Sequence, residues 1–385
     1  MRLWRELLTK NPGFFDEPKV PERSVMLSEM VAVYLLFHWG TGFSEGTLFG
    51  ETQGGGGEKH FAHAEDFFVR LARMEPQQVQ SMLMAAYDAI TKFTKPRVSS
   101  SSSGMSVVQE RIPRFRYDEE LTMECLKKHQ PEELVRAAKR LLGFECEEFS
   151  KDAWRNLEEF IPYKDWADRL SAEHSIVTFN YDRVVEIALG DRCRIVGVEG
   201  SSSNNDQKVD LYKLHGSTDW VLRGGVVSRT SIPCTRHEEI PFIAIPGKSK
   251  DEDTETLADV WEAAGNALEE ARDIHIVGYG LPESDAKARR FLLQRLRANR
   301  HKHLNINIVL GEPSFRRDRM EAILGQTLAR TPLEKAVRLQ AGLPPGSTQY
   351  QEVQAKKTLT LRVVNQYAQD YIQGYALNPQ GGATN

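Results

Sequence analysis

Short apolar runs alternate with helical segments through the second half of the chain, and this alternation restricts the fold more than any other feature. The runs are Ile176 to Phe179, Arg194 to Val198, Leu211 to Leu214, Phe242 to Ile245, Ile274 to Val277 and Ile306 to Leu310. The strongest helical segments between them are Leu257 to Ala271 and Ser284 to Arg297. Such alternation is typical of α/β proteins. The sequence therefore predicts a Rossmann-like, mainly parallel sheet with helices on both faces.

Several of these predicted strands end in residues that can carry chemistry. The strand ends hold Asn180 and Asp182, then His215-Gly-Ser217, then Gly278-Tyr-Gly280, then Gly311-Glu-Pro313. Parallel strands place their carboxyl ends along one edge of a sheet, which is where open α/β folds bind ligands. We therefore expect these side chains to lie near one another.

The residue types at these strand ends suit a nucleotide. Glycines let a phosphate or ribose approach the backbone closely, and helix N-termini offer free amide donors to phosphate oxygens. Histidine side chains ordinarily titrate near neutral pH, and His215 precedes a glycine that leaves room beside it, so it is a candidate general base. Each feature also has a plainer explanation, since Asn180 or Asp182 can cap the following helix and Gly278 can serve a tight turn. The repetition of such ends on successive strands favours a ligand site.

The first half of the chain predicts an arm followed by helices. Residues 1–30 are rich in proline and charge and predict an irregular arm. Val31 to Phe37 predicts a buried strand, with a turn of helix as the alternative. Apolar residues at three- and four-residue spacing predict helices from Phe61 to Lys95 and from Asp118 to Leu170. We take residues 60–170 as a helical insertion between two strands of one sheet, or as a small subdomain.

The last part of the chain predicts a mixture of elements. Thr331 to Leu339 predicts a helix, Leu359 to Val363 a strand, and Val364 to Tyr371 a terminal helix.

Composition excludes several classes of protein. The 385 residues hold 50 Lys plus Arg against 54 Asp plus Glu, and this balance does not predict a nucleic-acid partner. The cysteines, which lie at Cys125, Cys146, Cys193 and Cys234, form no CxxC pair and predict reduced thiols. The longest apolar run, Met30 to Phe37, is shorter than the roughly 20 residues of a membrane helix. The N-terminus lacks the apolar core of a signal peptide. We therefore expect a soluble, cytoplasmic protein with no membrane partner.

Three motifs occur in a recognisable order. They are Thr178-Phe-Asn-Tyr-Asp182, Lys213-Leu-His-Gly-Ser217 and Gly278-Tyr-Gly-Leu-Pro282 with Asp285. This order resembles the sirtuin-like NAD-binding family, and in particular the branch often found in bacterial anti-phage systems. The resemblance covers residues 31–325, including the insertion at 60–170. Residues 1–30 and 326–385 are then an N-terminal arm and a C-terminal extension.

The resemblance implies roles for individual residues. Asn180 and Asp182 would hold the nicotinamide-ribose end of NAD, and His215 would activate a ribose hydroxyl, so these three are the implied catalytic residues. The implied NAD-binding residues are Gly40, Gly42, Ser44, Thr178, Gly216, Ser217, Gly278, Tyr279, Gly280 and Glu312. Among them, Gly40-Thr-Gly-Phe-Ser44 echoes the opening glycine loop of the family, and Glu312 would lie near the adenine end.

Two departures separate the chain from the deacylases of this family. Deacylases carry a four-cysteine zinc module after the His-Gly motif, whereas the short stretch from His215 to Pro241 holds only Cys234, so no metal is expected. Their acyl-lysine-binding segment is replaced by Ala244-Ile-Pro-Gly-Lys248. Protein deacylation is therefore not the predicted activity.

The sequence leaves two main functional hypotheses. The first is hydrolysis of NAD to nicotinamide and ADP-ribose in a defence or NAD-depletion role, with water in the place of acetyl-lysine. The second is a catalytically silent sensor module that binds NAD or ADP-ribose. An NAD-dependent oxidoreductase is a weaker third, because no strand–helix junction carries GxGxxG with an acidic residue about 20 positions later. Destroying NAD harms the host, so we expect restraint by a regulatory protein partner or by homo-oligomerisation.

Overall fold

The protein is divided into two compact units, which are described separately. The first comprises Met1–Glu145, Asp219–Leu222 and Thr230–Glu252, and the second comprises Cys146–Thr218, Arg223–Arg229 and Asp253–Asn385. The computed structural model of the chain describes residues 33, 70–71, 73–84, 131–155, 157–198, 207–230, 240–244, 255–281, 285–311, 319–320, 322–324, 328, 334–336, 347–354 and 357–377.

The described part of the first unit is mainly helical, as its apolar spacing predicts. Residues 76–84 form a helix that buries Val79 and Leu83. Helix α8 (Pro131–Arg155), whose residues up to Glu145 belong to this unit, begins at a proline and carries Glu132 and Glu133 in its first turn, which suits the positive end of the helix dipole. Its Leu134, Ala137 and Ala138 are buried, and they form the predicted apolar face.

Two strand predictions in the first unit differ from the structure. Val33, the described residue of the run from Val31 to Phe37, lies in a helix, which was the alternative for that run. In the run from Phe242 to Ile245, Ile243 makes an isolated bridge instead of extending a strand. Proline lacks an amide donor, and Pro241 and Pro246 flank this run, so a longer hydrogen-bonded ladder is disfavoured.

The second unit begins with a three-stranded parallel sheet. Its strands are β1 (Ser175–Thr178), β2 (Cys193–Ile195) and β3 (Val209–Lys213), in the order β1-β3-β2. The helical elements beside these strands in the chain are α9 (Leu157–Asp168), α10 (Val184–Leu189) and the 3-10 turn η1 (Gly190–Arg192). A core of Ala167, Leu170, Ala188, Leu189 and Val209 joins the helices to the sheet. Ser175 to Thr178 pair with Asp210 to Lys213, which places Phe179 and Leu214 at the same edge.

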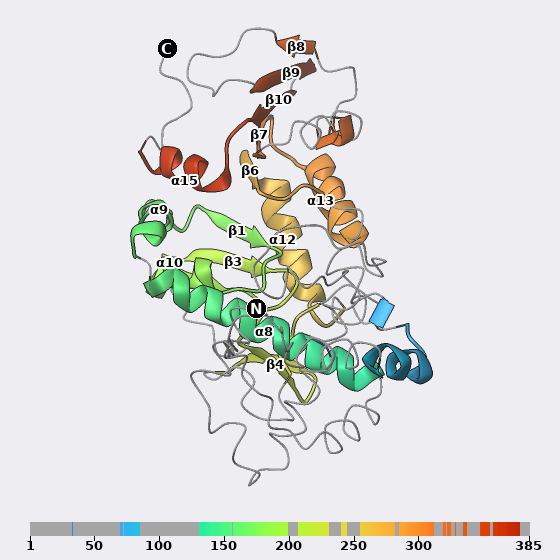
Figure 1. Cartoon of the computed structure of the whole chain (residues 1–385). Coiled ribbons are helices and arrows are strands. Elements are labelled where there is room, and N and C mark those ends of the chain that lie inside the picture. The colour runs from blue at the N-terminus through green and yellow to red at the C-terminus, as the bar shows by residue number, and fades with distance from the viewer. Residues whose placement is uncertain are drawn as a thin grey trace, which may run out of the picture. The chain divides into compact units, whose positions relative to one another are not determined.

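A five-stranded sheet follows in the same unit. Its strands are β6 (Asp273–Val277), β7 (His303–Val309), β8 (Glu334–Ala336), β9 (Thr348–Gln354) and β10 (Lys357–Val364), in the order β6-β7-β10-β9-β8. Strands β6, β7 and β10 are parallel, whereas β9 and β8 add in antiparallel fashion. The helices are α12 (Ala258–Glu270), α13 (Ala286–Ala298) and α15 (Ala368–Leu377), and α12 packs against α13 (Figure 1).

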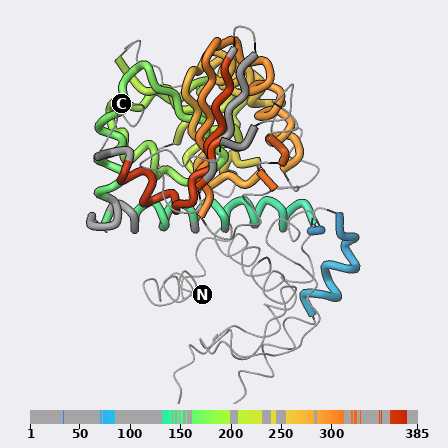
Figure 2. Tube along the Cα trace, turned by 90° about the horizontal axis from the view of Figure 1, so that it is seen from above, coloured from blue at the N-terminus to red at the C-terminus, as the bar shows by residue number. Residues whose placement is uncertain are grey.

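The C-terminal part of the chain is built into this sheet. Figure 2 shows β10 (red) beside β7 (orange), and the two strands pair from Thr358–His303 to Val364–Val309. The prediction of a helix from Thr331 to Leu339 is wrong, because Glu334 to Ala336 pair with β9. This pairing overrides the helical propensity of these residues. The terminal helix begins at Ala368 and not at Val364, since Val364 still pairs with Val309.

Between β3 and α12 lie two short strands that the sequence did not predict. They are β4 (Trp220–Arg223) and β5 (Val226–Arg229). Gly224 and Gly225, which connect them, have φ angles of 57° and 83°. Two successive positive φ angles are typical of a type I′ turn, which glycine adopts without steric cost.

The chain is therefore an α/β protein with parallel sheets and helices beside them. The described parallel strands lie in two sheets, whereas the sequence predicted one sheet. Among the described helices, none has the length and apolar character needed to cross a bilayer.

Candidate functional site

The carboxyl ends of three parallel strands of the second unit come together. Phe179 follows β1, His215 lies just beyond β3, and Tyr279 lies just beyond β6. The rings of Phe179 and Tyr279 are stacked with centroids 4.5 Å apart, and the Phe179 and His215 centroids are 5.0 Å apart. The carboxyl ends of parallel strands from both sheets therefore lie together, at the edge where the sequence predicts a ligand site.

A histidine and a carboxylate form the polar centre of this cluster. His215 is 5% exposed and Asp285 is 6% exposed. His215 Nε2 lies 3.5 Å from Asp285 Oδ2, and the Tyr279 hydroxyl donates to the same oxygen over 3.2 Å. The two side chains therefore place an imidazole beside a carboxylate at a site sheltered from bulk water.

The sequence places Asp285 in the third motif but gives it no role among the predicted site residues. Its position directly before α13 is typical of an N-cap residue, yet its side chain makes no capping hydrogen bond. The carboxylate instead contacts Tyr279 and His215. An aspartate that follows a glycine-rich strand end was the available signal, but a cap and a site residue give the same pattern in sequence.

A tryptophan from α12 supports the end of β3. Trp261 is buried, and its indole Nε1 donates to the Leu214 carbonyl over 2.9 Å. The Trp261 and His215 rings are 6.2 Å apart, and Phe291 of α13 meets the indole edge-on at 4.8 Å. The backbone that carries His215 is thereby fixed to the helix layer.

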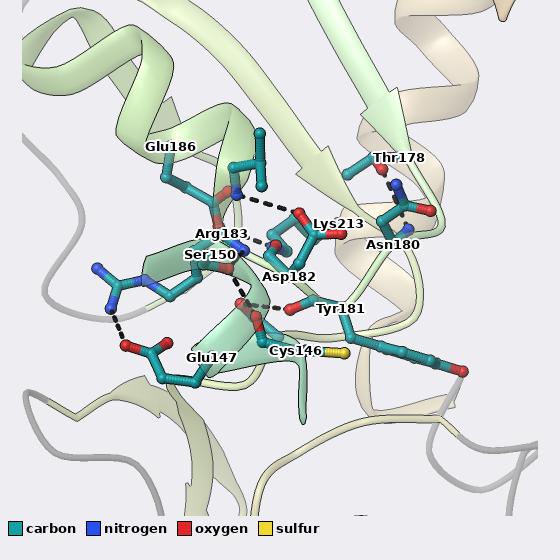
Figure 3. Close-up of polar contacts among 12 residues, drawn as sticks. Cys146, Glu147, Ser150, Thr178, Asn180, Tyr181, Asp182, Arg183, Glu186 and Lys213 are labelled. Atoms are coloured by element: carbon teal, nitrogen blue, oxygen red, sulfur yellow. Dashed lines mark hydrogen bonds and ion pairs between the residues drawn. The ribbon is translucent and has the colours of Figure 1, made fainter. Parts of the chain in front are cut away.

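The loop between β1 and α10 carries the two other predicted catalytic residues (Figure 3). Asn180 is exposed, and its backbone N–H donates to Thr178 Oγ1 over 3.1 Å. Asp182 Oδ1 accepts the Val184 N–H over 3.0 Å at the start of α10. Asp182 thus accepts the first amide of α10 from the position before the N-cap residue Arg183, and this contact occupies one of its two oxygens.

Several contacts hold this loop in place. The Arg183 N–H donates to Ser150 Oγ over 3.0 Å, and the Ser150 hydroxyl donates to the Cys146 carbonyl over 2.8 Å. On the other side, the Thr218 N–H donates to the Tyr181 carbonyl over 3.1 Å. The loop is therefore bound both to the C-terminal half of α8 and to the segment after β3 (Figure 3).

A buried ion pair lies beneath the same loop. The Lys213 side chain is 0% exposed, and its Nζ lies 2.7 Å from Glu186 Oε1. Lys213 Nζ also donates to the Asp182 backbone carbonyl. Burial, reinforced by the Glu186 charge, raises the pKa of the nearby Cys193 thiol to about 12. Sequence reasoning missed this pair, because a lysine inside an apolar strand resembles a surface residue.

The glycines at the strand ends provide room for a ligand. Gly216 and Gly278 have φ angles of 82° and 72°, which favour glycine over other residues. At Gly278 and Gly280, no heavy atom of the described residues, apart from the glycine and its two chain neighbours, lies within 4 Å of the position that a Cβ would take. Ser217 is fully buried, and its hydroxyl donates to the Tyr181 carbonyl over 3.4 Å. The backbone at the end of β6 is thus open to close approach by a ligand.

Some predicted site residues lie outside the described part of the chain. These are Gly40, Gly42, Ser44 and Glu312. Within the described part, no three His, Cys, Asp or Glu side chains form a group that could hold a metal ion.

No protein-family model matches the chain, and no curated protein matches it in sequence. A function for this site therefore has to be argued from its own residues.

Proposed function

We propose that the protein hydrolyses the nicotinamide–ribose bond of NAD to give nicotinamide and ADP-ribose. The supporting observation is the convergence of the buried His215–Asp285 pair with the stacked Phe179 and Tyr279 rings at the ends of parallel strands. Nucleotides bind at this edge in open α/β sheets. A Rossmann-like arrangement of the sheets belongs to the same proposal.

The reaction needs little beyond charge stabilisation and control of water. The bond between C1′ of the ribose and the nicotinamide nitrogen breaks, and its electron pair neutralises the cationic nicotinamide ring. The ribosyl group that remains has oxocarbenium character, and preorganised polar groups stabilise it. Water then forms the new bond to C1′ and loses a proton.

In this proposal, His215 accepts that proton and Asp285 stabilises the imidazolium that results. His215 Nε2 and Asp285 Oδ2 are 3.5 Å apart, and at this separation the carboxylate charge can stabilise an imidazolium. Asn180, whose side chain is exposed, is free to orient the carboxamide or the attacking water. Asp182 contributes its negative charge, while Oδ1 serves the start of α10.

The direct test is incubation of purified protein with NAD and chromatographic quantification of nicotinamide and ADP-ribose. We expect equal amounts of the two products, and we expect activity to fall at least about 100-fold in His215→Ala, the range typical for loss of a general base. His303→Ala is the matched control, because His303 is an exposed histidine at the start of β7. Unchanged activity in both His215→Ala and Asn180→Ala would show that the catalytic residues are wrongly assigned.

A second candidate is a catalytically silent module that binds NAD or ADP-ribose as a sensor. The observation that favours it is the Asp182 carboxylate, one oxygen of which is already bound by the Val184 amide. Calorimetric binding of NAD without release of nicotinamide would select this candidate over the enzyme.

The proposed biological role is NAD depletion in a bacterial defence response in the cytoplasm, restrained by a regulatory partner or by self-association. Measurement of cellular NAD after expression of wild-type protein and of His215→Ala tests this role. A fall in NAD that is equal for the two proteins would count against it.

A further inference from the structure

Lys213 is a charged residue in a position that ordinarily holds an apolar side chain. It is the last residue of β3, two positions before His215, and its side chain is 0% exposed. Removing an ammonium group from water is unfavourable unless a counter-charge and further hydrogen bonds compensate it. The presence of lysine here therefore calls for an explanation beyond filling space.

The contacts of the ammonium lie on both sides of the start of α10. Lys213 Nζ lies 2.7 Å from Glu186 Oε1, which belongs to the first turn of that helix. It also donates to the backbone carbonyl of Asp182, which lies in the loop before the helix (Figure 3). One side chain therefore connects the end of β3 to the loop that follows β1.

We infer that Lys213 is a positioning residue that holds the Asn180–Asp182 loop in register with the strand end that carries His215. Its hydrogen bond to the Asp182 carbonyl fixes the peptide two positions beyond Asn180. Glu186 supplies the negative charge that allows the ammonium to remain in the interior. The effect on catalysis rests on the proposed function, whereas the effect on the loop does not.

The ion pair itself is a poor candidate for a purely stabilising device. Glu186 Oε2 is buried and has no hydrogen-bond partner among the described residues. Buried ion pairs can often be replaced by apolar side chains of similar volume without loss of stability, whereas removal of one partner is strongly destabilising. Replacing both partners therefore separates stability from positioning.

The decisive comparison uses two double variants. Lys213→Met with Glu186→Met removes both charges and leaves the Asp182 carbonyl without its donor. Lys213→Gln with Glu186→Gln also removes both charges but keeps an N–H donor on the side chain at position 213. Lys302→Met is the matched control, because Lys302 is an exposed lysine just before β7.

Three quantities are measured on each protein: the urea midpoint of unfolding, the hydrogen exchange of amides 179–184, and kcat and KM for NAD. We expect the Met pair to unfold close to wild type yet to exchange these amides about tenfold faster, because the loop opens locally. We expect its kcat to fall about 10- to 100-fold, since misplacement of about 1 Å can cost this much. The Gln pair should lie closer to wild type in both exchange and kcat.

These outcomes distinguish a positioning role of Lys213 from a role in packing alone. Wild-type exchange and kcat in a folded Met pair would overturn the inference, as would equal behaviour of the Met and Gln pairs. If the Met pair does not fold, a Gln pair that folds with tenfold faster exchange also overturns it. If wild-type protein does not cleave NAD, the proposed function fails, while the exchange data still decide the role of Lys213.

Discussion

Replacing Trp261 tests whether α12 holds the strand end that carries His215. The indole Nε1 donates to the Leu214 carbonyl over 2.9 Å within a buried contact. Trp261→Phe keeps an aromatic ring against His215 and Phe291 but removes the only donor of the side chain. The change therefore isolates the hydrogen bond better than substitution by alanine would.

The expected cost follows from the geometry. Loss of one hydrogen bond costs about 1 kcal/mol net, and a buried carbonyl left without its partner costs about 1–3 kcal/mol. We therefore expect Trp261→Phe to lower the free energy of unfolding by about 2–3 kcal/mol. Phe291→Leu is the control, because it alters the edge-on ring contact at 4.8 Å while leaving the indole bond in place. It should cost about 1 kcal/mol.

Urea unfolding followed by far-UV circular dichroism measures both values by linear extrapolation. Because Leu214 directly precedes His215, the same Trp261→Phe protein should also lose NAD turnover while Phe291→Leu retains most of it. A stability loss below about 0.5 kcal/mol for Trp261→Phe would refute the argument that this bond anchors the end of β3.

Three further predictions concern charge and ionisation. Cys193, with its pKa raised to about 12, should react with iodoacetamide at pH 8 roughly a thousandfold more slowly in folded protein than in urea, as mass spectrometry of the labelled peptide would show. Asp182→Asn should keep the helix start and the unfolding free energy but lose NAD turnover, whereas Asp182→Ala should also cost about 1 kcal/mol in urea unfolding. The Arg295 hydrogen bond, aided by Arg300, holds the pKa of Glu269 below its ordinary value. The ionised Glu269 carboxylate therefore stabilises the folded protein above the ordinary carboxyl pKa, and this stabilisation is lost as pH falls through the lowered pKa. Glu269→Gln should then be less stable than wild type at pH 7. The urea midpoints of the two proteins should converge in acid.

The elements with strong periodicity could be predicted from the sequence. Strands β1, β3, β6 and β7 have apolar runs long enough to identify, and α12 and α13 have apolar faces at helical spacing. Strands β4 and β5 could not be identified, because half or more of their residues are exposed or half-buried and each strand has only four residues. Strand β8 could not be predicted either, since Glu334-Lys-Ala336 has helical propensity and becomes a strand only through pairing with β9.

The candidate site likewise has residues that could be predicted from the sequence and contacts that could not. The positions of Asn180, His215 and Tyr279 follow from where apolar runs end, so local sequence was enough to predict them. The His215–Asp285 contact joins the segment after β3 to the residue before α13, and the Lys213–Glu186 contact joins a strand to a helix. Such pairs depend on tertiary packing, so a local pattern does not show which side chains are in contact.

The most direct test of the central claim is one time course of NAD with purified wild-type protein and His215→Ala, with nicotinamide and ADP-ribose quantified together. We predict that wild-type protein releases the two products in equal amounts and that His215→Ala releases at least about 100-fold less in the same time. Equal product release by the two proteins would contradict the assignment of His215, and no release by wild-type protein would contradict the proposed activity itself.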